Sequence, residues 1–147
     1  MSWHVPARVA ANCGVSGERR EWLARLPETV RALEQKWALT AGDPFDGEEV
    51  SCAWVAPAAL RDGTAAVLKL GMPHMEAEHE AAGLRFWAGN ATVRLLREDQ
   101  ELGAMLLEKC EPGSWLRALP EPEQDRVIAG LLRRMWRPVP AGWPFRP

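Results

Sequence analysis

The sequence predicts an α+β domain in which helices pack on an antiparallel sheet. Two pairs of short apolar runs are each joined by a tight polar turn, and segments with helical spacing of apolar residues flank these pairs. A chain of 147 residues has about the length of one domain. The helices and strands are therefore expected to share a single core.

Composition and charge narrow the class of protein. The chain is 47% hydrophobic and 26% charged, with a formal net charge of -2 and both signs interspersed. No basic stripe is present, so nucleic acid is not the expected partner. No apolar run approaches the roughly 18 residues of a membrane span, and the first residues do not resemble a signal peptide, so we expect a cytoplasmic protein. Cys13, Cys52 and Cys110 lack metal-type or CxxC spacing and are expected to be reduced thiols.

The first elements expected are a loose segment and a helix. Residues 1–17 contain glycine, serine and proline without a clear period, and we expect them to be loose. An interior proline costs about 3 kcal/mol, so Pro27 predicts a kink or break near Leu26, with Pro27 in the first turn of a helix running to Leu39. The helical face is formed by Trp22, Leu26, Val30, Leu33 and Trp37.

A hairpin and a second helix are predicted next. Residues 50–56 and 65–70 are predicted strands, joined by a tight turn at residues 61–64. Pro73 is expected to open a helix that Gly89 ends. The apolar residues expected to pack this helix across the sheet are Met75, Ala82, Leu84, Phe86 and Trp87.

The remaining chain is predicted to hold a second strand pair and more helices. Strands are expected at residues 92–97 and 104–108, followed by a short helical piece at 114–119 and a helix at 120–136. The proline-rich residues 137–147 are expected to be a linker. The residues expected to face inward from the last helix are Val127, Ile128, Leu131, Leu132 and Met135, with Trp136 also in the core. Trp115 and Trp143 are expected to be exposed.

Lys69, near the end of the strand at 65–70, is the candidate functional residue. A buried ammonium is costly unless a carboxylate or a phosphate meets it, and the following helix offers Glu76, Glu78 and Glu80. Glu76 and Glu80 are four residues apart, so either could reach a sheet beneath the helix. The alternative for Lys69 is a buried stem with its amine in water, and for Glu76 and Glu78 we prefer a solvated helix turn favoured by the helix dipole.

The order of these elements, with a strand lysine followed by a helix glutamate, is typical of a kinase-like amino-terminal lobe and its hinge. Seven stretches carry a more specific resemblance: residues 20–27, 54–58, 62–64, 67–69, 79–85, 106–113 and 140–147. In order and spacing they closely resemble the aminoglycoside/hydroxyurea antibiotic resistance kinases of the streptomycin 6-kinase type. The resemblance runs from about Arg19 to the last residue and covers the amino-terminal half of such an enzyme.

This resemblance implies roles for two charged residues and one hydroxyl. Lys69 matches the lysine that contacts the phosphates of ATP, and Glu80 matches the glutamate that orients it. The glycine-rich loop of protein kinases is missing between Gly47 and Trp54, where Ser51 is the available hydroxyl.

The resemblance also implies a hinge after the last strand. Glu108, Lys109 and Cys110 match the segment whose backbone groups receive adenine. Gly113 matches the glycine that turns the chain into the second lobe. On its own, Cys110 is expected to be a buried small hydrophobe, because no histidine is near it in the sequence to activate it.

The catalytic part of such a kinase is not found in the sequence. Kinases of this shape use an Asp as base, and an Asn and a second Asp to hold Mg²⁺. None of His4, His74 and His79 is followed two positions on by Asp, and His74 and His79 do not form a His-Glu-x-x-His zinc motif. We therefore assign no catalytic residue and no metal ligand to this chain. The expected organisation is a loose segment at 1–18, a kinase-like lobe with hinge at 19–110 and the start of a truncated helical second lobe at 111–147.

By resemblance, the function is that of an ATP-dependent phosphotransferase that uses Mg²⁺ and acts on an alcohol group of an aminoglycoside such as streptomycin, which gives antibiotic resistance. The chain alone is expected to be inactive. The alternative is a non-catalytic nucleotide-binding or dimerising module derived from such a kinase, with its exposed apolar edge covered by a partner or a second copy. A third, weaker alternative is a non-functional relic of a gene.

Overall fold

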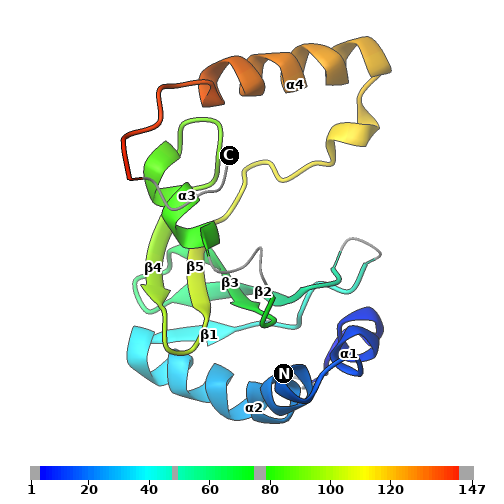
Figure 1. The fold of residues 1–147 in the computed structure, drawn as a ribbon, viewed down its shortest axis with the longest axis vertical. Coiled ribbons are helices and arrows are strands. Elements are labelled where there is room, and N and C mark those ends of the chain that lie inside the picture. Colours follow the sequence, from blue (N-terminus) through cyan, green and yellow to red (C-terminus); the bar gives the residue numbers. More distant parts are fainter. Residues whose placement is uncertain (1–3, 48–49, 75–78, 143–147) are drawn as a thin grey trace.

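The computed structural model describes residues 4–47, 50–74 and 79–142. These residues form an α+β fold around a five-stranded antiparallel sheet with strand order β1-β2-β3-β5-β4 (Figure 1). The predicted fold class is confirmed. The elements are α1 (Ala7–Cys13), α2 (Gly17–Trp37), β1 (Leu39–Ala41), β2 (Ala53–Leu60), β3 (Ala65–Gly71), α3 (Glu80–Trp87), β4 (Leu95–Asp99), β5 (Ala104–Glu108), the short 3-10 helix η2 (Leu116–Ala118) and α4 (Glu121–Met135).

The amino-terminal segment was expected to be loose. This expectation is wrong, because the segment contains the helix α1. Val9 and Cys13 of α1 are fully buried and form a small cluster with Met72, which directly follows β3. The segment is ordered because these apolar side chains are removed from water by that contact. Burial also raises the pKa of the Cys13 thiol.

The helix α2 is longer than the sequence predicted and is not broken at its proline. It begins at Gly17, where the Ser16 side chain caps it by accepting a hydrogen bond from the Arg19 amide, and it continues through Pro27 to Trp37. The predictions of a break near Leu26 and of a helix start at Pro27 are therefore wrong. The apolar face of α2 packs along the sheet, and that packing offsets the hydrogen bond lost at proline.

Strand β1 was not predicted from the sequence, because the preceding helix was expected to run to Leu39. Instead, Ala38 takes a left-handed conformation with φ 53° and ends α2, and β1 then pairs with β2, with Leu39 opposite Leu60. A strand of three residues is too short to show a recognisable alternation of apolar and polar side chains.

The predicted hairpin is present, but β2 lies later in the chain than residues 50–56. The prediction ended the strand before Pro57, whereas β2 continues to Leu60. The Pro57 carbonyl accepts a hydrogen bond from the Gly42 amide at 2.8 Å, so its backbone faces the β1 side. Its missing N–H therefore removes no bond from the β2–β3 ladder. Strands β3 and β5 lie where they were predicted, and β4 begins three residues later than predicted.

The core lies between α2 and one face of the sheet. Helices α1 and α2 lie on one side of the sheet, and α3 and α4 lie on the other (Figure 1). The predicted apolar face of α2 is confirmed, with Trp22 partly buried at its start. The core side chains are Leu26, Val30, Leu33 and Trp37 of α2 together with Trp54, Ala56, Ala66, Leu68, Leu70 and Leu106 of the sheet.

The other side of the sheet is covered less completely. The predicted helix start at Pro73 cannot be compared, because residues 75–78, with Met75, lie outside the described residues. Within α3, Gly83 is buried and the predicted apolar residues Ala82, Leu84, Phe86 and Trp87 are only partly buried. An ion pair between Arg85 and Glu98 joins α3 to β4.

Helix α4 and the short η2 helix lie where the sequence predicts helices, but the prediction of an inward apolar face for α4 is wrong. Val127, Ile128, Leu132 and Trp136 are exposed, and no residue of α4 is buried. Trp115 is exposed, as expected. Residues 137–142 form neither helix nor strand, and residues 143–147, with Trp143, lie outside the described part of the chain. None of the described helices combines the length and apolarity needed to cross a membrane.

Candidate functional site

The β2–β3 hairpin fixes which way Lys69 faces. Its turn is closed by a hydrogen bond from the Leu60 amide to the Thr64 carbonyl, which aligns Val55 with Lys69 across the ladder. Because Leu68 and Leu70 are buried against α2, the alternation of a strand turns Lys69 to the opposite face. Lys69 therefore lies in the middle of the sheet, on the side of α3.

On that face, Lys69 forms an ion pair with Glu80 of α3. The Lys69 Nζ atom lies 2.5 Å from Glu80 Oε1, and the two side chains are 25% and 31% exposed. Of the two glutamates that the sequence left open, Glu80 makes this contact, and Glu76 lies outside the described residues. The ammonium thus has the helix carboxylate partner that the sequence indicated.

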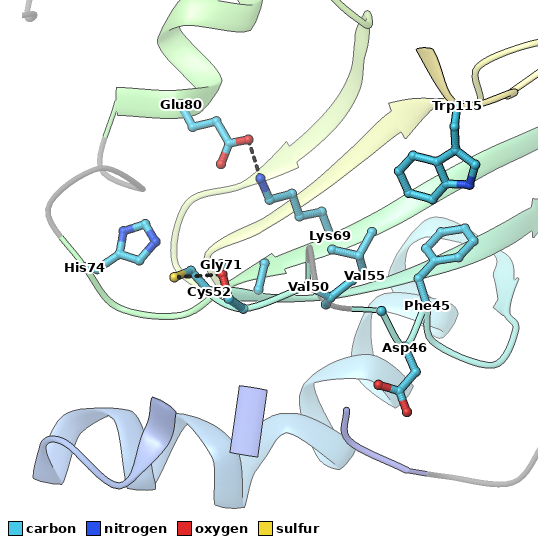
Figure 2. A pocket seen from close by; sticks show the side chains of 13 residues that line it. Phe45, Asp46, Val50, Cys52, Val55, Lys69, Gly71, His74, Glu80 and Trp115 are labelled. Carbon is cyan, nitrogen blue, oxygen red and sulfur yellow. Dashed lines mark hydrogen bonds and ion pairs between the residues drawn. The ribbon is translucent and has the colours of Figure 1, made fainter. Parts of the chain in front are cut away.

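A cavity of about 780 Å³ lies beside this ion pair. Figure 2 shows Lys69 and Glu80 at one end of the cavity and the aromatic rings of Phe45 and Trp115 at the other. Val55 lines the floor between them. The cavity therefore combines an apolar, aromatic end with a partly buried positive charge that is already held by a carboxylate.

The wall of the cavity next to β2 is formed by the segment that precedes this strand. Val50, Ser51 and Cys52 all line the cavity. The Ser51 carbonyl accepts a hydrogen bond from the Asn12 side chain at 2.9 Å, and the Ser51 hydroxyl donates to the Cys52 sulfur at 3.6 Å. The predicted hydroxyl therefore does lie at the cavity. His74 lines the same cavity near its polar end (Figure 2).

A second cavity, of about 910 Å³, lies between the start of α3, the end of β3 and the β4–β5 turn, and several acidic residues line it. It shares Gly71, His74 and Glu80 with the first cavity. Its acidic side chains include Asp99, which forms an ion pair with Lys36 at 2.7 Å and accepts a hydrogen bond from the Leu102 amide. The hydrogen bond from Lys36 holds the pKa of the Asp99 carboxyl below its usual range. Glu98 is likewise paired, with Arg85. This cavity does not combine a cation with an aromatic end, and we do not consider it the functional site.

The three residues predicted to form the hinge lie apart from the first cavity. The described lining of that cavity does not include Glu108, Lys109 or Cys110. The Glu108 carboxylate accepts hydrogen bonds from the Arg94 amide and guanidinium at 2.7 and 2.8 Å, and these bonds hold the pKa of Glu108 below its usual range. Lys109 forms an ion pair with Glu111 at 3.2 Å.

Cys110 and Gly113, which belong to the predicted hinge and the turn after it, can also be compared with the sequence predictions. The Cys110 thiol is exposed, so the expectation of a buried hydrophobe is wrong, because the chain leaves the sheet after β5. Gly113 has φ 72°, and a side-chain carbon there would lie 3.0 Å from the Cys110 carbonyl oxygen. A glycine is required for this turn.

The aromatic end of the cavity was not predicted from the sequence. Phe45 follows β1, and its amide donates to the Val55 carbonyl at 2.8 Å, so it depends on the strand that was missed. Val55 could have been found, because counting an equal number of residues back and forward from the turn aligns it with Lys69. Trp115 was expected to be exposed, which it is, but not to line a cavity.

The described residues contain neither a metal-ligand cluster nor a disulfide. Within residues 4–47, 50–74 and 79–142, no group of three or more His, Cys, Asp or Glu side chains could hold a metal ion. Cys13, Cys52 and Cys110 are free thiols, as the sequence predicts.

An antiparallel sheet with a central lysine and a helix glutamate paired to it is the architecture of a kinase-like amino-terminal lobe. The family described as aminoglycoside/hydroxyurea antibiotic resistance kinase matches residues 36–146. The chain belongs to this family.

Several curated relatives are similar to most of the chain. The streptomycin 6-kinase of Streptomyces griseus is 38% identical over 143 residues, which is 95% of this chain and 46% of the relative. The streptomycin 6-kinase of Streptomyces glaucescens is 39% identical over 85% of this chain and 41% of its own length. The hydroxyurea phosphotransferase of Kitasatospora aureofaciens is 38% identical over 79% of this chain and 34% of its own length. The chain thus spans less than half the length of these relatives. No solved structure matches it.

Proposed function

We propose that this chain is the nucleotide-binding lobe of an ATP-dependent phosphotransferase that acts on an alcohol group of an aminoglycoside such as streptomycin. The observation that carries the proposal is the Lys69–Glu80 ion pair at one end of a cavity whose other end is aromatic. In this proposal, residues 19–110 form the lobe with its hinge and residues 111–147 begin a second, helical lobe. The cytoplasmic location expected from the sequence is part of the same proposal.

The residues of the cavity fit the chemistry of ATP. An ammonium has three donors, so Lys69 can keep its bond to Glu80 while donating to the α- and β-phosphates. Glu80 would fix the position of that ammonium. The Ser51 hydroxyl lies at the same wall, and it would donate to a phosphate oxygen in place of its bond to the Cys52 sulfur.

The aromatic end fits the base of the nucleotide. Phe45 and Trp115 offer ring faces on which a purine can stack. Adenine would also need backbone partners in the hinge. The Glu108 amide already donates to the Arg94 carbonyl, so the hinge amides for this role would be those of Lys109 and Cys110.

The residues described here do not fit Mg²⁺, and we route no step of the reaction through it. Phosphoryl transfer also needs a base for the acceptor hydroxyl, and the sequence has no histidine followed two positions on by aspartate. The share of the reaction that falls to this chain is therefore to bind and orient the nucleotide. We expect the purified chain to show negligible turnover with ATP and streptomycin, and robust turnover would contradict this statement.

The test of the proposal is an ATP titration of the purified chain and of Lys69→Ala by calorimetry. The matched control is Lys36→Ala, which also removes a lysine from an ion pair but lies on α2, away from the cavity. Loss of a charge-assisted contact of about 1.5–3 kcal/mol is expected to weaken binding by about tenfold or more in Lys69→Ala and to leave the control unchanged. Equal ATP affinity in wild type and Lys69→Ala would remove Lys69 from the site.

The exposed apolar face of α4 favours a second candidate, a non-catalytic module that dimerises. Val127, Ile128 and Leu132 are all exposed on one helix, and such a face is usually covered in a stable assembly. Sedimentation of the chain over a range of concentrations distinguishes the two. A monomer at every concentration leaves the dimerising module without support.

A further inference from the structure

Helices α1 and α2 each donate a side-chain hydrogen bond to a backbone segment next to the cavity. The Asn12 side-chain amide donates to the Ser51 carbonyl at 2.9 Å, across 39 residues of sequence. The Arg19 guanidinium donates to the Pro73 carbonyl at 3.1 Å, across 54 residues. Both hydrogen bonds are partly buried. Ser51 lines the cavity, and so does His74, the neighbour of Pro73.

Apolar packing joins the same parts of the molecule. Val9 and Cys13 of α1 are fully buried against Met72, and Val50 packs on the edge of this cluster. The Met72 amide donates to the Cys52 carbonyl at 3.0 Å, which connects the end of β3 to the segment before β2. The cavity wall at residues 50–52 is thus held between the end of β3 and helix α1.

These helices lie on the side of the sheet opposite α3 (Figure 1). The cavity lining includes no residue of α1 or α2 among the described residues, so neither helix would touch a ligand there. The family match begins only at residue 36, so the two donors lie outside the matched segment. Their effect on the cavity must act through the backbone carbonyls that they hold.

We propose that Asn12 and Arg19 are positioning residues for nucleotide binding, because they fix the backbone of Ser51, which lines the cavity, and of Pro73, the neighbour of the lining residue His74. This inference rests on the proposed function. Without the Asn12 bond, the Ser51 segment has to be ordered when the nucleotide binds, and that ordering lowers the affinity. The fold remains, because the apolar cluster of Val9, Cys13 and Met72 is not changed.

The test compares ATP affinity in Asn12→Leu, which keeps the bulk of the side chain and removes its donor, with wild type. The control is Arg20→Ala, which removes a 2.9 Å bond to the Gly14 carbonyl inside the α1–α2 unit and leaves both cavity segments untouched. Because a net hydrogen bond contributes about 0.5–1.5 kcal/mol, we expect Asn12→Leu to bind ATP about three- to tenfold more weakly. Arg20→Ala is expected to bind like wild type.

Three further readouts separate positioning from a general loss of stability. Amide hydrogen exchange of residues 50–54 is expected to be faster in Asn12→Leu and unchanged in Arg20→Ala. Asn12→Gln keeps a donor on a longer arm and is expected to recover most of the ATP affinity. Arg19→Met is expected to weaken binding in the same direction, and an unchanged affinity would exclude Arg19 from the inference.

The possible failures are distinguishable. If wild type binds ATP and Asn12→Leu binds it equally well, the inference is wrong and the proposed function stands. Equal losses in Asn12→Leu and Arg20→Ala, or a loss in Asn12→Gln as large as in Asn12→Leu, would also overturn it. If wild type does not bind ATP at all, the proposed function fails and takes the inference with it.

Discussion

Helices α2 and α4 have the same kind of sequence pattern and opposite surroundings. In α2, the apolar positions Leu26, Val30 and Leu33 are 1%, 2% and 0% exposed. In α4, Val127, Ile128 and Leu132 are 41%, 43% and 56% exposed. Both helices carry an apolar stripe on one face, but only α2 lies against a sheet.

The comparison shows that helical periodicity identifies an apolar face but not the surface that covers it. The stripe of α2 meets the alternating small and branched residues of β2, β3 and β5. Helix α4 is joined to α3 by polar contacts, in which the Trp87 indole donates to the Met135 carbonyl at 3.0 Å and Arg137 donates to the Phe86 carbonyl at 3.2 Å. Burial should therefore stabilise α2 much more than α4.

The largest expected difference is in amide hydrogen exchange. Core amides of α2 should open only with free energies near that of global unfolding, which is about 5–15 kcal/mol for a typical domain. Amides of α4 should exchange many-fold faster, because a helix of 15 residues is marginal without packing. Exchange followed by mass spectrometry of peptides from both helices measures this, and equal protection would show that α4 is covered in solution.

A smaller difference is expected from matched leucine substitutions. Leu33→Ala leaves a cavity in the core and should lower the free energy of unfolding by about 2–5 kcal/mol. Leu132→Ala, on the exposed stripe of α4, should change it by no more than about 0.5 kcal/mol. Urea unfolding followed by circular dichroism measures both values. A large cost at Leu132 would contradict an exposed stripe and would favour the dimerising module.

The smallest expected effect concerns the ion pair between Lys36 at the end of α2 and Asp99 at the end of β4. Hydrogen bonds from Lys36 and from the Leu102 amide lower the pKa of Asp99, so ionised Asp99 stabilises the fold above the ordinary aspartate pKa of about 3.9. That contribution is lost as the pH falls through and below this value.

Asp99→Asn should therefore lose less stability than wild type when the pH is lowered from about 6 to about 3. Urea unfolding at both pH values gives the two differences. Identical losses in the two proteins would mean that Asp99 does not contribute to the acid sensitivity of the fold. Because Lys36 is largely exposed, we expect this effect to be well below that of Leu33→Ala.

Much of the fold could be predicted because its signals are local. Strands β3 and β5 are apolar runs bounded by turn residues, and the buried face of α2 follows from its spacing alone. The errors have long-range causes. Pro27 was expected to follow a break near Leu26, yet packing on the sheet maintains α2 through it. The first strand was predicted to stop at residue 56, yet β2 continues through Pro57, whose backbone direction leaves the β2–β3 ladder intact.

The charged residues of the candidate site could be predicted from the sequence, but the aromatic residues that line the cavity could not. A glutamate partner for Lys69 in the next helix followed from the cost of an unpaired ammonium on a strand, and the family resemblance selected Glu80 over Glu76. Phe45 and Trp115 could not be predicted, because they come from segments 70 residues apart that meet only in the folded chain. Asn12 was missed because the segment that carries it was expected to be loose.

The most direct test of the central claim is the reactivity of the three lysines of the chain toward an amine-acylating reagent, with and without ATP. Mass spectrometry of peptides reports Lys36, Lys69 and Lys109 separately in one sample, so Lys36 on α2 serves as an internal control. A phosphate bound to the Lys69 ammonium should slow its acylation by about tenfold at saturating ATP, while Lys36 reacts at an unchanged rate. Acylation of Lys69 at the same rate with and without ATP would contradict the claim that this amine binds the nucleotide.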